Sequence, residues 1–241
     1  MNRYVYYFDY ECRNFYKKMT GFLDRHVTFK NKDILCLGSG SGYFPLHYVE
    51  KGARTVTCLD ISADFIKLFS GKLRTLGADS RKVSILKKDM AGFELKKKFD
   101  LVLINGNSFV CLLSQEKQIA CLESIRRHLK PGGKAYIDIF PFSDRINERF
   151  SLKRSFTDAK GLVVAESAYG TMSIPDHRLD FHITWSSKEG VFRDVVKSRI
   201  LTLPEMYLLF KVTGLKIRKV FCDYSERVRK NASSWTFEVG K

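Results

Sequence analysis

The chain has 241 residues, enough for one sizeable α/β domain, and a formal net charge of +16 from 42 basic and 26 acidic side chains. No apolar run reaches the roughly 18 to 20 residues that span a bilayer, and the first residues lack the uninterrupted apolar core of a signal peptide, so we expect a cytoplasmic protein with no membrane contact. The six cysteines show no Cys-x-x-Cys pair and no histidine at metal-ligand spacing, which predicts reduced thiols and no metal site.

Hydrophobic periodicity predicts strands and helices in alternation through the first 140 residues. Strands are expected at 33–37, 53–60, 82–89, 99–105 and 134–140. Helices are expected at 43–52, at 63–77 behind an N-cap at Ser62, and at 114–130. Helices between successive strands force parallel pairing, which predicts a doubly wound sheet with its ligands at the carboxyl ends of the strands.

The C-terminal third predicts antiparallel structure. Along 177–187, Leu179, Phe181, Ile183 and Trp185 alternate with Asp180, His182, Thr184 and Ser186. A second run at 190–202 follows a short turn, which indicates a half-buried hairpin. A helix at 204–214 and strands at 215–222 and 233–241 complete an α/β fold: a doubly wound, mostly parallel, seven-stranded Rossmann-like sheet with an antiparallel β cap.

The stretch GSGSG, residues 38–42, separates the first strand from its helix. Missing side chains at the end of a strand let a ligand lie against the backbone and face a helix N-terminus. Asp60 ends the next strand, 22 positions after Gly38, where a carboxylate can accept hydrogen bonds from ribose hydroxyls. The alternative is a set of turn glycines beside a helix-capping aspartate. A dinucleotide fingerprint would need glycine where Tyr43 stands, so NAD is disfavoured.

Five motifs in order over residues 34–140 resemble the class I S-adenosylmethionine-dependent methyltransferases. They are ILCLGSGSGYF, TCLDIS, KKDM, FDLVLINGNSFVCLL and IRRHLKPGGKAYIDIF. The segment after residue 199 resembles the tail of the small-molecule N- and O-methyltransferases. The resemblance implies S-adenosyl-L-methionine as the cofactor and S-adenosyl-L-homocysteine as the product.

The resemblance also implies roles for individual residues. Gly38, Ser39, Gly40 and Gly42 would approach the methionyl and ribose part of the cofactor, Asp60 would hold the ribose hydroxyls, and Ile61 would pack on the adenine. Asp89 would accept from the adenine amino group, Met90 would donate its backbone N–H, and Asn105 and Asn107 would line the methyl-transfer end. One position departs from the family, because Cys36 stands where an acidic residue is usual. That departure leaves open weakened binding or a non-catalytic, methyltransferase-like protein.

We expect a single domain over residues 1–241. It would comprise an N-terminal helical lid (1–30), a cofactor-binding core (31–140), a substrate cap inserted at 141–203, and closing elements (204–241). By resemblance, the aromatic residues of the lid would cover the cofactor, with a tyrosine near the methyl group; helix packing alone explains them equally well. These aromatic residues are Tyr4, Tyr6, Tyr7, Tyr10, Phe15 and Tyr16.

The expected acceptor is a nitrogen or oxygen of a small polar molecule. His177 and His182 are candidate bases, and Arg178 and Arg199 are candidate ligands for a substrate carboxylate, with His182, Arg199 and Asn107 expected nearest the acceptor. The net charge keeps open an RNA-directed enzyme, such as one that methylates guanine N7 of a cap. Residues 141–200, however, hold ten basic and eight acidic side chains. So balanced a segment favours a compact metabolite.

Overall fold

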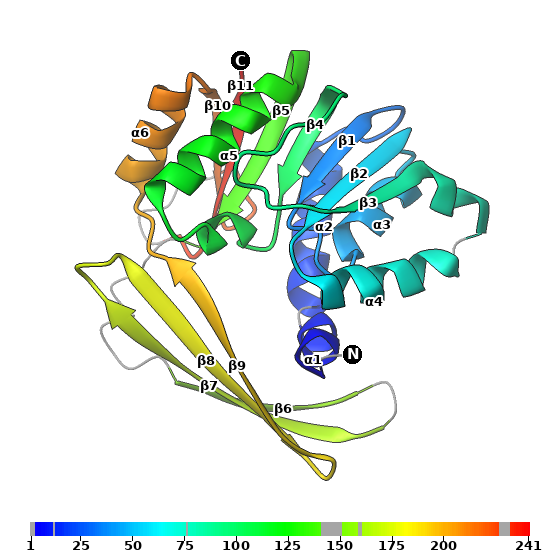
Figure 1. The fold of residues 1–241 in the computed structure, drawn as a ribbon, viewed down its shortest axis with the longest axis vertical. Coiled ribbons are helices and arrows are strands. Elements are labelled where there is room, and N and C mark those ends of the chain that lie inside the picture. The colour runs from blue at the N-terminus through cyan, green and yellow to red at the C-terminus, as the bar shows by residue number, and fades with distance from the viewer. Residues whose placement is uncertain (1–2, 12, 76, 141–150, 159–160, 227–231) are drawn as a thin grey trace.

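The computed structural model describes residues 3–11, 13–75, 77–140, 151–158, 161–226 and 232–241. Figure 1 shows a helix-flanked sheet above a second, curved sheet that projects from one end of it. The larger sheet has seven strands in the order β10-β11-β5-β4-β1-β2-β3, and the smaller has four in the order β6-β7-β8-β9. The prediction of a mostly parallel seven-stranded sheet with an antiparallel cap is confirmed.

The central strands β1 to β5 pair in parallel, and β11 joins β10 and β5 in antiparallel register. The strands of this sheet are β1 (Asp33–Leu37), β2 (Thr55–Asp60), β3 (Val83–Lys87), β4 (Phe99–Ile104), β5 (Leu129–Ile139), β10 (Lys216–Cys222) and β11 (Trp235–Gly240). The helices are α1 (Arg3–Glu11), α2 (Arg13–His26), α3 (Tyr43–Glu50), α4 (Ala63–Arg74), α5 (Gln115–His128) and α6 (Leu203–Thr213). Every strand and helix predicted in residues 33–140 is present, with shifted ends.

Local sequence signals fix the helix ends. The Ser62 hydroxyl accepts from the Phe65 N–H at the start of α4, and Gly214, with φ of 70°, ends α6. The predicted end of α4 at Gly77 was wrong, because the helix stops at Arg74 and the Thr75 hydroxyl donates to the Lys72 carbonyl. A side chain that bonds its own backbone competes with a further helical turn.

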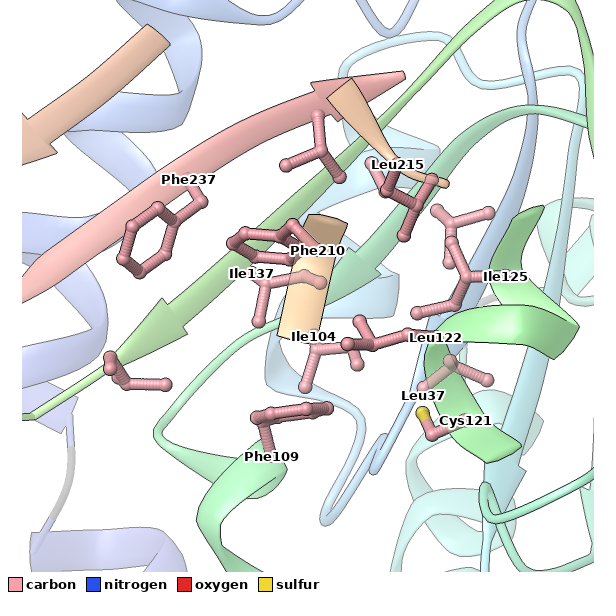
Figure 2. Packing of buried hydrophobic residues seen from close by; sticks show 14 of the residues in the cluster. Leu37, Ile104, Phe109, Cys121, Leu122, Ile125, Ile137, Phe210, Leu215 and Phe237 are labelled. Carbon is pink, nitrogen blue, oxygen red and sulfur yellow. The ribbon is translucent and has the colours of Figure 1, made fainter. Parts of the chain in front are cut away.

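Apolar side chains cover both faces of the seven-stranded sheet. On one face, Leu37, Ile104 and Ile137 pack against α5 and α6 (Figure 2). On the other, Ile34, Cys36 and Leu103 pack against α2 and α3. A parallel sheet buried on both faces holds the carboxyl ends of its strands rigidly, and these ends carry the glycine loop.

The cap sheet consists of β6 (Ser151–Thr157), β7 (Val163–Ser173), β8 (Arg178–Ser187) and β9 (Gly190–Arg199). The predicted hairpin corresponds to β8 and β9, whereas β6 and β7 were not predicted. The inward positions of β7 include Glu166, a buried carboxylate that interrupts the apolar alternation. Its partner is Arg154 on β6, with Nε 3.1 Å from Oε2. This ion pair allows a carboxylate at an inward position of β7, and the pattern of β7 taken alone does not reveal it.

The predicted division of the chain at residues 30, 140 and 203 stays a prediction, and 141–150, the start of the predicted cap, lie outside the described residues. No helix in the described ranges is long and apolar enough to cross a bilayer. Cys36, Cys58, Cys121 and Cys222 are buried and Cys111 is exposed, all five as free thiols. Cys12 lies outside the described residues.

Candidate functional site

The glycine loop follows β1, the strand whose two neighbours, β2 and β4, lie on opposite sides of it. Gly38, Gly40 and Gly42 all have left-handed backbones, with φ of 66°, 53° and 86°. A Cβ on Gly42 would stand 2.0 Å from Phe69 Cδ2, and one on Gly38 would stand 2.7 Å from Ser108 Cβ. A Cβ on Gly40 would meet no described protein atom within 4 Å. The loop is therefore packed at both ends and open at its centre.

Asp60 closes one side of this opening. Its Oδ2 accepts from the Gly40 N–H at 2.7 Å, and its Oδ1 accepts from the Ser62 N–H at 2.9 Å. Burial raises the pKa of Asp60, and these backbone N–H groups oppose the shift by stabilising the ionised form. The carboxylate thus lies beside the bare backbone of Gly40.

The side chains predicted to contact the adenine lie beyond Asp60. Ile61 is 67 % exposed, unusual for an isoleucine that directly follows a buried strand. The Asp89 carboxylate accepts from the Ala91 N–H at 2.9 Å, which shapes the turn after β3, and Met90 packs against the core of the sheet. An exposed apolar surface beside a formed turn suits a flat heterocycle, and the adenine roles stay predictions.

Asn105 and Asn107 follow β4 but differ in what they bind. The Asn105 amide donates to the Tyr48 hydroxyl, and its buried Oδ1 has no partner among the described residues. The Asn107 Oδ1 accepts from the Phe140 N–H at 2.8 Å. The side-chain oxygen of Asn107 is therefore bound to the end of β5, whereas the side-chain oxygen of Asn105 is available for a ligand or a water molecule.

Asp138, on β5, is a site residue that sequence reasoning missed. It is fully buried, its Oδ1 accepts from the Asn107 N–H at 3.3 Å, and burial raises its pKa to about 7. The available signal was an aspartate within the apolar run YIDIF. A carboxylate in the interior of a buried strand is costly unless it has partners, and such a residue often marks a functional position.

Helix α1 bridges the glycine loop and the cap. The Asp9 carboxylate accepts from the Ser41 hydroxyl and from Lys72 Nζ, the latter at 2.8 Å. Two residues earlier, the Tyr7 ring lies 6.3 Å from that of Trp185 on β8. The lid role of this helix stays a prediction. Tyr6 and Tyr16 pack against aromatic neighbours, while the side chains of Tyr4, Tyr10 and Phe15 lie outside the described set.

The cap turns one face toward α1, and His182 lies on the opposite face. Tyr7 contacts Trp185, which shares its face with Ile183, whereas His182 alternates with them and stacks on Tyr169 at 4.7 Å. His182 therefore points away from the face that contacts α1, and its role toward the acceptor stays a prediction.

Three other residues predicted near the acceptor differ in their surroundings. Arg199 is buried and donates to Glu205 Oε1 at 2.6 Å, an ion pair that fixes β9 to α6. Arg178 bonds Asp180, and His177 occupies an exposed turn with φ of 50°. Only Arg199 is held in a buried ion pair, and the acceptor roles of all three residues stay predictions.

Cys36 stands in the first motif where an acidic residue is usual, and the structure gives this position no charge. Cys36 is fully buried on the α2–α3 face of the sheet, and burial raises its pKa, which keeps the thiol neutral. No charge therefore stands at this position. In the described ranges no group of three histidine, cysteine, aspartate or glutamate side chains is placed to hold a metal ion.

Substituting alanine at Gly40 is expected to abolish cofactor binding while leaving the fold intact. The new Cβ would point into the open space beside Asp60. Gly132, with φ of 72° and no atom near its hypothetical Cβ, is the matched control, because it carries the same backbone strain far from the loop. Calorimetry with S-adenosylhomocysteine should separate the two variants. Equal affinity in both would show that the ligand does not lie against Gly40.

Known proteins resemble this chain in sequence and in fold. Residues 34–133 match the family described as a methyltransferase domain. The cypemycin N-terminal methyltransferase of a Streptomyces species is 31 % identical over 120 residues, which are 50 % of this chain and 46 % of that protein. The chain spans less than half the length of the curated relatives that it matches.

Two solved structures show the same fold over nearly the whole chain. A S-adenosylmethionine-dependent methyltransferase from Clostridium acetobutylicum has a TM-score of 0.78 at 20 % identity, covering 93 % of this chain and 91 % of its own. CalS10 from Micromonospora echinaspora, an amino pentose methyltransferase with S-adenosylmethionine bound, has a TM-score of 0.72 at 17 % identity, covering 97 % and 96 %.

Proposed function

We propose that this chain is a methyltransferase of the class I S-adenosylmethionine-dependent superfamily and that it transfers a methyl group to the nitrogen of a small organic amine. The observation that carries the proposal is the opening at Gly40, where the bare backbone lies beside the Asp60 carboxylate. A nucleoside with free ribose hydroxyls fits both features.

S-adenosylmethionine is the cofactor of this domain, and the residues present fit it. Gly40 would take the ribose and methionyl chain against its backbone, Asp60 would hold the ribose hydroxyls, and Ile61 would cover the adenine. The cofactor supplies a methyl group already activated by its sulfonium. The protein then has to hold both reactants in line and exclude water.

Positioning is the task of the side chains around the loop. The unpartnered Asn105 Oδ1 offers an acceptor beside the glycine turn, and α1 shields that turn through the contact of Asp9 with Ser41. An amine attacks as its neutral form, so the site needs a route for one proton and no strong base.

The inward face of the cap favours an amine as the acceptor. Trp185 and Phe192 pair across β8 and β9 on this face, and Asp194 is the next inward residue of β9. Glu166 on the same face is neutralised by Arg154, which leaves Asp194 as a partly buried negative charge among aromatic rings. Aromatic faces and a carboxylate attract an organic cation and disfavour a phosphate. An amine acceptor also agrees with the substrates of two similar proteins, the cypemycin N-terminal methyltransferase and the amino pentose methyltransferase CalS10.

The test is transfer of a tritiated methyl group from S-adenosylmethionine to amino sugars, small amines, short peptides with a free α-amino group, and hydroxyl analogues of each. We expect label in the amines and none in the analogues. Total RNA, with and without nuclease, is the remaining arm. Label that appears only with RNA and vanishes after nuclease treatment would overturn the proposal.

A matched pair of variants tests the cap. Asp194→Asn, on the inward face, is expected to raise KM for the amine about tenfold, since it removes one charge-assisted contact. Asp180→Asn makes the same change on the outward face and should leave KM unchanged. An equal effect of both substitutions would place the acceptor outside the cap.

A further inference from the structure

Three buried oxygen atoms near the carboxyl ends of β4 and β5 have no hydrogen-bond partner among the described residues. They are Asn105 Oδ1, Asp138 Oδ2 and Thr236 Oγ1. Asp138 pairs with Thr236 across β5 and β11, and Asn105 continues β4, the other neighbour of β5. Native interiors leave few polar atoms unsatisfied, so this cluster calls for a role other than packing.

The Asp138 carboxylate holds the loop that follows β4. Its Oδ1 accepts from the Asn107 N–H at 3.3 Å, and the neighbouring Gly106 N–H also favours the ionised form of the carboxylate, lowering its pKa against the effect of burial. A second hydrogen bond joins the same two segments, since Asn107 Oδ1 accepts from the N–H of Phe140, two residues after Asp138. The loop and the end of β5 are thus fastened at two points.

That loop in turn presses on the glycine turn. The Ser108 hydroxyl donates to the Asn105 carbonyl at 2.9 Å, and Ser108 Cβ lies 2.7 Å from the position that a Cβ on Gly38 would occupy. A displacement of residues 105–108 therefore changes the contact with Gly38, at one end of the glycine turn.

We propose that Asp138 is a positioning residue for the cofactor site, whose ionised carboxylate holds the backbone of Gly106 and Asn107 and so sets the place of Asn105 beside the glycine turn. The proposal rests on the proposed function, because it assigns this loop to the methyl-transfer end. Asp138 is fully buried, so we assign it an effect through the loop and not a direct contact with either reactant.

Ionisation of Asp138 falls in the neutral range. Burial raises its pKa to about 7, and the titratable groups that face it, Tyr48 on α3 and Tyr224 after β10, are kept neutral because burial raises the pKa of both hydroxyls. Cys36, which faces Tyr48, is likewise a neutral thiol, and Glu238 on β11 pairs with Lys134. As pH falls through 7, Asp138 gains a proton, and its charge-assisted bonds to the loop become neutral ones.

The experiment measures the dissociation constant of S-adenosylhomocysteine by calorimetry between pH 6 and pH 8, so no methyl acceptor is involved. For the unmodified chain we expect affinity to fall about fivefold toward pH 6, the difference between charge-assisted and neutral hydrogen bonds. Asp138→Asn keeps an acceptor oxygen but cannot ionise, so its affinity should lose that pH dependence. Asp138→Leu should bind weakly at every pH, and thermal unfolding of each variant reports whether it folds.

Glu238→Gln is the matched control, because it makes the same carboxylate-to-amide change at another buried position of the same sheet. It should keep the pH profile of the unmodified chain. An identical profile in the unmodified chain and Asp138→Asn would overturn the positioning role while leaving the proposed function intact. Absence of S-adenosylhomocysteine binding at any pH would contradict both.

Discussion

Replacing Asp60 with alanine is expected to weaken binding of S-adenosylhomocysteine by between about tenfold and a hundredfold, the range for a lost hydrogen bond to a charged group. The carboxylate already accepts from the Gly40 and Ser62 N–H groups, so it stands beside the bare part of the loop. Its removal would take away the ribose acceptor and the partner of Gly40 together. Calorimetry at pH 8, where Asp138 is ionised in every variant, gives the affinity.

The fold should survive this change. Burial raises the pKa of Asp60, which means that folding disfavours its charged form, so alanine removes a cost as well as two hydrogen bonds. Asp60→Asn, which keeps an acceptor for the backbone, should lose less affinity. Asp79→Ala removes an exposed carboxylate that pairs with Lys82 and should change nothing. Unaltered affinity in the Asp60→Ala chain would place the ribose elsewhere.

Replacing Gly42 with alanine is expected to cost about 2 to 5 kcal/mol of stability and to abolish cofactor binding. The new Cβ would stand 2.0 Å from Phe69 Cδ2, and φ of 86° is a conformation that alanine avoids. Left-handed strain costs roughly 1 to 2 kcal/mol, and overpacking a core adds roughly 1 to 3 kcal/mol. For a domain of this size the melting temperature should fall by about 5 to 15 °C.

Gly52 supplies the control for backbone strain. Its φ of 84° nearly equals that of Gly42, but a Cβ there would lie 3.6 Å from Lys30 Cγ, an ordinary contact. Gly52→Ala should therefore lose only the strain term and keep cofactor affinity. Phe69→Leu combined with Gly42→Ala should recover part of the lost stability by removing the ring edge. A melting temperature equal in the two glycine variants would contradict the steric argument.

Local patterns were enough for the parts of the site that lie along one stretch of chain. The open turn at Gly40 follows from a buried strand, three alternate glycines and a helix that succeed one another directly along the chain. Each of these features can be recognised from a short stretch of sequence. Asp60 follows from the same logic, since parallel neighbours bring their carboxyl ends to one edge. The alternation in 177–187 likewise predicted a two-faced strand, and Trp185 and His182 lie on opposite faces of it.

Partners far apart in sequence were decided only by the tertiary structure. Which face of the cap turns inward depends on Tyr7, some 180 residues away from Trp185, and this contact leaves His182 on the outward face. Glu166 places a charge at an inward position of β7, and its ion pair with Arg154 on β6 compensates the burial of that charge. The Arg199 guanidinium is buried against Gln118, 81 residues earlier in the chain, whose Oε1 accepts from Nη1 at 3.4 Å.

The sequence by itself determined the seven-stranded sheet, the glycine loop and the carboxylate beside it, because hydrophobic period and backbone permissiveness are local properties. Only the tertiary structure decided that Asp138 fastens the loop after β4, that α1 joins the loop to the cap, and that the inward cap face is aromatic and acidic. Each of these depends on burial and on contacts between distant segments. The free energy of a charged side chain depends on its burial and on its neighbours, and local sequence patterns do not reveal either of them.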